Sequence, residues 1–61
     1  MRTYIITYTY PLIYQGTYVV KGVDGFDASK KLQKYLKEHY GGTNDSHSMV
    51  YEIYDNKLIF V

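Results

Sequence analysis

Residues 3–10 alternate between two kinds of side chain. The even positions carry tyrosine and isoleucine, and the odd positions carry mainly threonine. Successive side chains of a β-strand point to opposite faces, so this alternation predicts a strand over residues 3–10. We expect the even face to pack beneath a helix; it consists of Tyr4, Ile6, Tyr8 and Tyr10. The odd face consists of Thr3, Ile5, Thr7 and Thr9.

Three more segments have the composition of strands, at residues 17–22, 48–54 and 57–61. Asp55 and Asn56 separate the last two segments and tolerate positive φ, which predicts a two-residue hairpin turn. The alternation leaves open which set of side chains from residues 48–54 lies on the face away from the helix. The two choices are Val50, Glu52 and Tyr54, or Met49, Tyr51 and Ile53.

Residues 25–40 follow the period of a helix. Their apolar stripe recurs every three to four residues and consists of Ala28, Leu32, Tyr35, Leu36 and then His39 or Tyr40. Asp24 is suited to cap the first turn, and Asp27 can reach back to the same turn. Gly41 is suited to end the helix. A later start, with Asp27 as the cap, is an alternative.

These elements follow one another in the order ββαββ. A hairpin that leads into one helix and then into a second hairpin predicts an α+β fold with an antiparallel sheet of strand order 2-1-3-4. The helix is expected on one face of this sheet, and residues 1–61 form a single small domain. A swapped dimer, or the third strand beside the second, are the alternatives.

Residues 11–16 separate the first two strands and have two interpretations. Pro11 cannot donate to a ladder, so the first strand is expected to end near it. The next three residues are apolar, which is unusual for a turn. Either the strands continue past Pro11 and turn near Gly16, or the loop exposes Leu12, Ile13 and Tyr14 to solvent.

Composition restricts the classes of function. The chain has 61 residues, no cysteine and a net charge of +1, which argues against a disulfide framework, a thiolate metal site and a strongly electrostatic nucleic-acid binder. Its N-terminus lacks the apolar core of a signal peptide, and no apolar run is long enough to cross a membrane. We therefore expect a cytoplasmic protein with no membrane partner.

Catalytic chemistry is not expected. A nucleophile elbow, a phosphate-binding glycine loop and a zinc-protease motif are all missing from the sequence, and so small a domain has little room for a dry pocket. His39, Asp45 and His47 are the best candidates for a metal site, but their spacing matches no standard zinc site. We predict no enzymatic activity, no catalytic residue, no cofactor, no metal and no small-molecule substrate.

Nucleic-acid binding is the weaker of two functional hypotheses. Lys30, Lys34 and Lys37 line the outer face of the predicted helix and can contact phosphates, while tyrosines of the sheet can stack on single-stranded bases. These two features point in different directions, because the lysines face away from the side of the sheet that the helix leaves bare.

Protein binding is the stronger hypothesis. One helix covers only one face of a four-stranded sheet, and the other face is rich in threonine and partly apolar, as at many protein interfaces. We predict that Leu12, Ile13 and Tyr14 anchor a partner. Ile5, Val19 and the last strand, an open edge guarded only by Lys57, are predicted to form a dimer contact.

The sequence therefore predicts a non-enzymatic protein-interaction module. It is expected to bind another protein or itself, most simply as a homodimer. By analogy with the small proteins of phage genomes, the expected viral role is to bind and modulate, or inhibit, a larger host protein. Single-stranded nucleic-acid binding through the helix lysines is the alternative.

Overall fold

The computed structural model describes residues 1–42 and 45–61, so Thr43 and Asn44 lie outside the described residues. The elements follow in the order β1 (Arg2–Tyr10), η1 (Leu12–Tyr14), β2 (Gly16–Gly22), α1 (Gly25–Tyr40), β3 (His47–Tyr54) and β4 (Lys57–Phe60). The four predicted strands and the predicted helix are confirmed. The short 3₁₀ helix η1 is an addition that the sequence did not predict.

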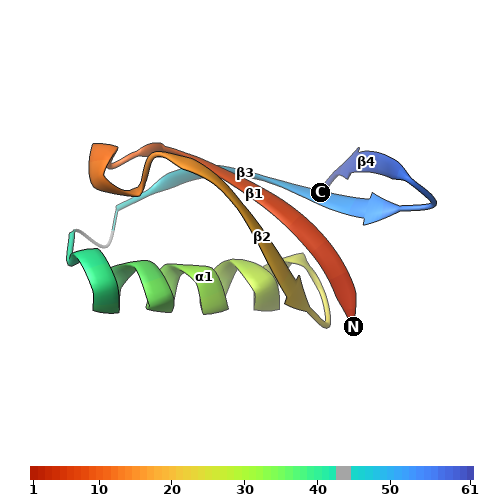
Figure 1. Ribbon diagram of the computed structural model, residues 1–61, viewed down its shortest axis with the longest axis horizontal. Helices are drawn as coiled ribbons and strands as arrows, with labels where there is room; N and C mark the ends of the chain where they lie inside the picture. The colour runs from red at the N-terminus through yellow and green to blue at the C-terminus, as the bar shows by residue number, and fades with distance from the viewer. Residues whose placement is uncertain (43–44) are drawn as a thin grey trace.

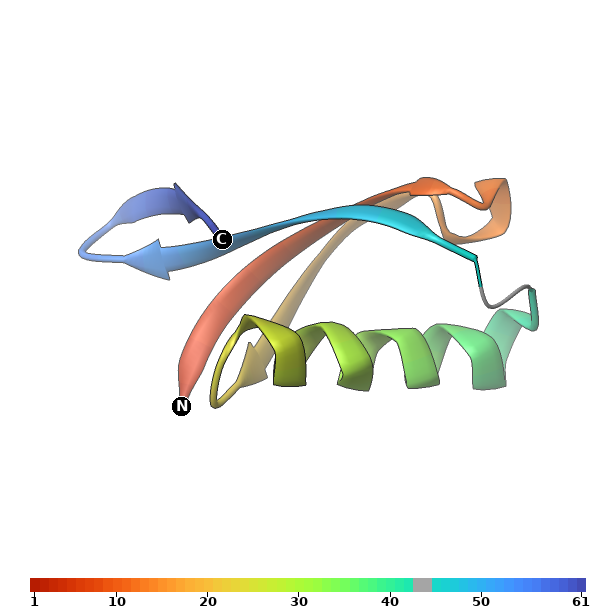
Figure 2. The same ribbon diagram turned by 180° about the vertical axis from the view of Figure 1, so that it is seen from behind.

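The strands form one antiparallel sheet in the order β2-β1-β3-β4, as predicted. Figures 1 and 2 show α1 along one face of this sheet, with the β3–β4 hairpin extending past the first turn of the helix. The third strand lies beside the first, so the alternative that placed it beside the second is wrong.

Strand register determines which side chains share a face. Ile5 pairs with Val19 of β2 and with Tyr51 of β3. Paired residues of an antiparallel sheet lie on the same face, so Met49, Tyr51 and Ile53 belong to the face that carries Ile5. Val50 belongs to the other face and packs against the core, which resolves the choice that the alternation left open.

The core lies between α1 and the sheet. Its buried residues are Tyr4, Ile6, Tyr8, Tyr14, Ala28, Leu32 and Leu36. The even face of β1 therefore packs beneath the helix, as predicted, with Tyr18 and Val20 of β2 at its margin. Tyrosine hydroxyls inside this core find partners: Tyr14 donates to the carbonyl of Gly41, and Tyr18 donates to the carbonyl of Tyr14 at 2.7 Å.

Two parts of the predicted apolar pattern are wrong. Tyr10 is exposed because the register of β1 against β3 shifts between Tyr8 and Tyr10, at a β-bulge that re-aims the strand. On the helix, Tyr35, His39 and Tyr40 are exposed, since only the narrower stripe of Ala28, Leu32 and Leu36 meets the sheet. The ring of Tyr35 stacks instead on His39, with 4.2 Å between centroids.

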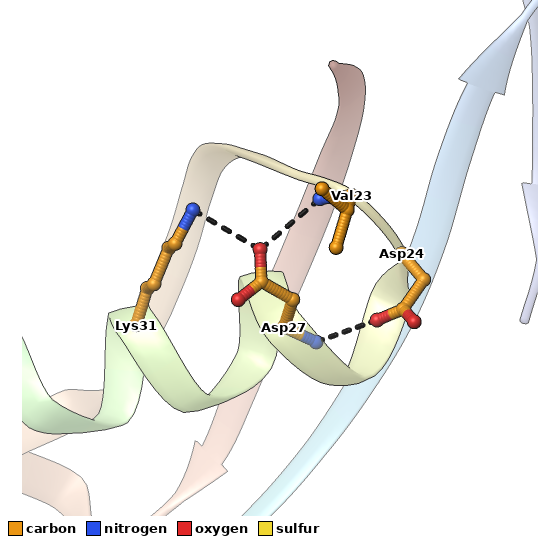
Figure 3. A network of polar contacts seen from close by, with 4 residues as sticks. All are labelled: Val23, Asp24, Asp27 and Lys31. Carbon is orange, nitrogen blue, oxygen red and sulfur yellow. Dashed lines mark hydrogen bonds and ion pairs between the residues drawn. The ribbon is translucent and has the colours of Figure 1, made fainter.

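The first turn of α1 is held by two carboxylates (Figure 3). Asp24 is the N-cap and accepts from the backbone N–H of Asp27 at 2.8 Å. Asp27 reaches back to the N–H of Val23 at 3.0 Å and also pairs with Lys31 at 3.0 Å. The predicted cap is confirmed, and the alternative start at Asp27 is wrong. At the other end Gly41 has φ 72°, a conformation that favours glycine.

Gly22 explains how β2 can lead into α1 almost without a loop. A Cβ at this position would lie 2.8 Å from the backbone nitrogen of Ala28. Only glycine leaves room for the strand to approach the first turn of the helix this closely. The geometry that places the helix over β1 and β2 therefore depends on a residue without a side chain.

Candidate functional site

The face of the sheet opposite α1 is covered by no helix or strand among residues 1–42 and 45–61 (Figures 1 and 2). We call it the bare face. Its side chains come from all four strands, and the register assigns to it Thr3, Ile5, Thr7, Thr17, Val19, Lys21, Met49, Tyr51, Ile53, Leu58 and Phe60. We take this surface as the candidate functional site.

An apolar row crosses the bare face from edge to edge. Val19 lies opposite Ile5, Ile5 lies opposite Tyr51, and Tyr51 lies opposite Phe60. The two ends of the row are open to solvent, since Val19 is 68% and Phe60 is 65% exposed. Met49 and Ile53 flank Tyr51 along β3, so the apolar surface is contiguous. A patch of this kind on a small protein is typical of a docking surface.

Charge is sparse on this surface. Among its described strand positions Lys21, on the edge strand β2, is the only Lys, Arg, Asp or Glu. Glu52 lies on the helix side, where it pairs with Arg2 at 3.8 Å. The core of a protein interface is likewise depleted of charged residues, with polar groups confined to its rim.

Side chains of the bare face already contact one another. The rings of Tyr51 and Phe60 meet edge to face, with centroids 5.4 Å apart. The hydroxyls of Thr7 and Thr17 lie 3.3 Å apart across β1 and β2. Cross-strand pairs of this kind stabilise the sheet.

The predicted interface residues separate into two groups. Ile5 and Val19 lie together on the bare face, as a shared contact requires. Leu12 and Ile13 lie on η1 and are exposed, Leu12 at 76%. Tyr14 is 0% exposed, so its prediction as an outward anchor is wrong. The physical reason is that η1 turns its third residue inward, where the ring packs edge to face on Tyr8.

The lysines of α1 do not lie on the bare face. Lys30, Lys34 and Lys37 share a shallow patch on the outer face of α1 with Gln33 and Glu38, on the side away from the core. Lys30 lies over the ring of Phe26, with 5.1 Å between its Nζ and the centroid. The structure does not bring these cations together with the aromatic residues of the bare face.

His39, Asp45 and His47, the candidates considered for a metal site, do not form a cluster. Within residues 1–42 and 45–61, no three His, Cys, Asp or Glu side chains come together in a way that could hold a metal ion. His47 packs against the ring of Tyr10, with 5.6 Å between centroids. His39 stacks on Tyr35.

Shifts in pKa occur in the core and at its edges. Burial raises the pKa of Tyr8 and of Tyr18. The backbone N–H of Val23, followed by Lys31, lowers the pKa of the Asp27 carboxyl. A hydrogen bond with Tyr4, followed by the charge of Glu52, raises the pKa of the Arg2 guanidinium. These shifts reflect packing of the tyrosine core and capping of the helix.

Several residues of the bare face were not singled out from the sequence. Leu58 and Phe60 were included only as part of the last strand, and Met49, Tyr51 and Ile53 were one of two choices. The two-residue turn at Asp55 and Asn56 fixes the pairing of β3 with β4, so it would have placed Leu58 and Phe60 on the same face as Tyr51 and Ile53. It would not have shown which face of the sheet that is.

Comparisons with protein-family models, curated proteins and solved structures found no match to this chain. No helix among the described residues has the length and apolar character needed to cross a membrane.

Proposed function

We propose that this chain is a non-enzymatic protein-interaction module and that the bare face is its docking surface. The observation that carries the proposal is the apolar row of Val19, Ile5, Tyr51 and Phe60 across all four strands. One helix is too narrow to cover both faces of the sheet, so these side chains stay in contact with water until a partner covers them.

The chemistry of the bare face defines which kind of partner can cover it. The partner needs an apolar patch to cover the row, and polar groups at its rim to meet the threonine hydroxyls. It needs no strongly charged surface at the centre, because the described strand positions of the bare face carry only Lys21, near one edge. A folded protein, either a larger host protein or a second copy of this chain, satisfies these conditions better than a polyanion does.

Photo-crosslinking from three positions tests the proposal in the source cell. A benzoylphenylalanine in place of Val19 samples the bare face, one in place of Leu12 samples η1, and one in place of Lys34 samples the outer face of α1. All three positions are exposed, so the folded chain accepts the bulky group at each. We expect a protein adduct of discrete mass from Val19, and none of that mass from Lys34.

A matched variant makes the result specific. Adding Ile5→Lys to the Val19 probe places a charge in the middle of the apolar row, and we expect the adduct to be lost while circular dichroism stays unchanged. Adducts formed equally from Val19 and Lys34, or nucleic acid as the main product, would refute the proposal. An adduct from Leu12 alone would move the docking surface to η1.

A further inference from the structure

The sheet has two edge strands, β2 and β4, and the edge of β4 is the more apolar of the two. All four of its residues are exposed, and within the described residues β4 contacts β3 and no other helix or strand. Three of the four are large and apolar: Leu58, Ile59 and Phe60. Natural edge strands are usually protected by charges, proline or bulges, whereas Lys57 is the only such residue in β4.

Backbone geometry shows which groups β4 offers to a neighbour. The N–H of Val61 donates to the carbonyl of Val50 at 2.9 Å. Hydrogen-bonded and non-hydrogen-bonded pairs alternate along an antiparallel ladder, so Lys57, Ile59 and Val61 direct their backbone groups to β3. Leu58 and Phe60 consequently direct theirs away from the sheet.

We propose that β4 pairs antiparallel with β4 of a second copy, about a twofold axis that passes midway between the Ile59 residues of the two copies. In this register Leu58 lies opposite Phe60 of the second copy, and Phe60 lies opposite its Leu58. Both outward-facing residues of each strand are then used, which gives four backbone hydrogen bonds. The proposal rests on the proposed function and names the partner at one edge of the surface.

Side chains fit the same register. Leu58 and Phe60 lie on the bare face, so each forms a cross-strand apolar pair with the other copy, and the two Ile59 side chains meet on the helix side. Lys57 lies opposite Val61 of the second copy, which keeps the two cations apart. A net charge of only +1 per chain adds little repulsion. The edge is therefore complementary to itself.

The arrangement of the dimer follows from its symmetry. A twofold axis normal to the sheet keeps both helices on one side and both bare faces on the other, in one eight-stranded sheet. The projecting hairpin becomes the centre of the sheet and no longer an exposed pair of strands. A short edge buries less than the roughly 800 Å² per partner of a standard interface, so we expect association in the micromolar range.

New charges at Leu58 and Phe60 test both the proposed dimer surface and its strand register. In Leu58→Lys/Phe60→Lys, each new cation lies opposite a new cation of the other copy. In Leu58→Lys/Phe60→Glu, each new cation lies opposite a new carboxylate, and both variants lose the same Tyr51–Phe60 ring contact. We expect the second variant to dimerise roughly tenfold more tightly than the first, from two charge pairs of opposite sign.

Sedimentation equilibrium gives the readout. The wild type is expected to approach twice the 7.2 kDa of one chain as its concentration rises, and Leu58→Lys/Phe60→Lys is expected to stay monomeric. A wild type that stays monomeric up to roughly 1 mM overturns the proposal. A dimer that persists in Leu58→Lys/Phe60→Lys, or no recovery in Leu58→Lys/Phe60→Glu, also overturns it.

A third variant is a control for unfolding of the two charged variants. Chemical synthesis with an N-methyl group on Leu58 removes one outward N–H and leaves every side chain in place, and we expect it to abolish the dimer. Photo-crosslinking from position Val19 is measured separately in each of these β4 variants. A protein adduct that persists when the β4 dimer is absent leaves the proposed function standing without this inference.

Discussion

Tyrosine is the residue on which this core depends. Three of the seven buried core residues are tyrosines: Tyr4, Tyr8 and Tyr14. A buried hydroxyl without a partner costs free energy, yet no buried side-chain polar atom of the described residues is left without one. A domain this thin, 14 Å along its shortest axis, keeps every ring close to a backbone carbonyl or to the surface.

The ring of Tyr14 packs on Tyr8, and its hydroxyl donates to the carbonyl of Gly41, so Tyr14 joins η1, β1 and the end of α1. The Tyr14→Phe variant tests this role. The change leaves the carbonyl of Gly41 without its donor. We expect a loss of about 1 kcal/mol in the free energy of unfolding, and a melting temperature lower by roughly 4–8 °C. Thermal and urea denaturation give both values.

Tyr54→Phe is the matched control, since it removes the same atom from an exposed residue. We expect it to change stability by a few tenths of a kcal/mol at most, within the usual range for surface substitutions. If both variants are equally stable, the Tyr14 hydroxyl does not hold the end of the helix.

At the scale of elements, the start of α1 combines capping with an ion pair. Asp27 accepts from the N–H of Val23 and pairs with Lys31, and its pKa lies below the ordinary value of 3.8. A carboxylate whose folded-state pKa is lowered stabilises the fold fully above its unfolded pKa. That contribution is lost as the pH falls through the folded pKa.

Asp27→Asn tests this pH dependence. The wild type is expected to be more stable than the variant at pH 7, and the difference is expected to shrink as the pH falls below about 4. Urea denaturation at a series of pH values measures it. Asp55→Asn, in the exposed hairpin turn, is the control for removing a carboxylate elsewhere on the surface. A difference that stays constant down to pH 2.5 would contradict the assignment.

Local patterns in the sequence predicted individual strands and the helix correctly. Strict alternation in β1 and a helical stripe beginning at Ala28 are short-range signals, and both led to the observed structure. The inward turn of Tyr14 and the bulge before Tyr10 have no such signal. The first depends on the contact of Tyr14 with Gly41 at the end of α1, and the second on the pairing of β1 with β3. Both involve residues far apart in sequence.

The whole molecule has two sides of different character. Basic residues of α1 face one direction, and the apolar row of the bare face points the opposite way. The structure therefore does not bring the lysines of α1 and the aromatic residues of the bare face onto one surface. This separation is why we propose a protein partner for the bare face.

Replacing Lys30, Lys34 and Lys37 by glutamine tests the rival hypothesis. We expect the variant and the wild type to show the same weak retention on single-stranded oligonucleotides. Fluorescence anisotropy over a range of salt concentrations measures the affinity. If the lysines bind phosphates, the wild type would show a log–log salt slope near −2, and the variant would lose it. That outcome would favour nucleic acid over protein.

The sequence alone determined the four strands, the α-helix and their order. Period-two and period-3.6 patterns are local, and capping residues and turn residues mark where each element ends. The same patterns placed Ile5 and Val19 on one face of the sheet, the face that the helix leaves uncovered. Their direct pairing comes from the register of β1 and β2 in the structure. The patterns did not reveal that Tyr14 lies in the core, since a three-residue apolar loop is consistent with either exposure or burial.

Only the tertiary structure decided which side of β3 and β4 joins the uncovered face. It also separated Leu12 and Ile13 from Tyr14, and it left β4 in contact with β3 alone. These outcomes depend on the packing of one 16-residue helix, which reaches β1, β2 and β3 but not β4. Which surfaces a helix leaves uncovered is fixed by its place over the sheet, and that place is a property of the assembled core.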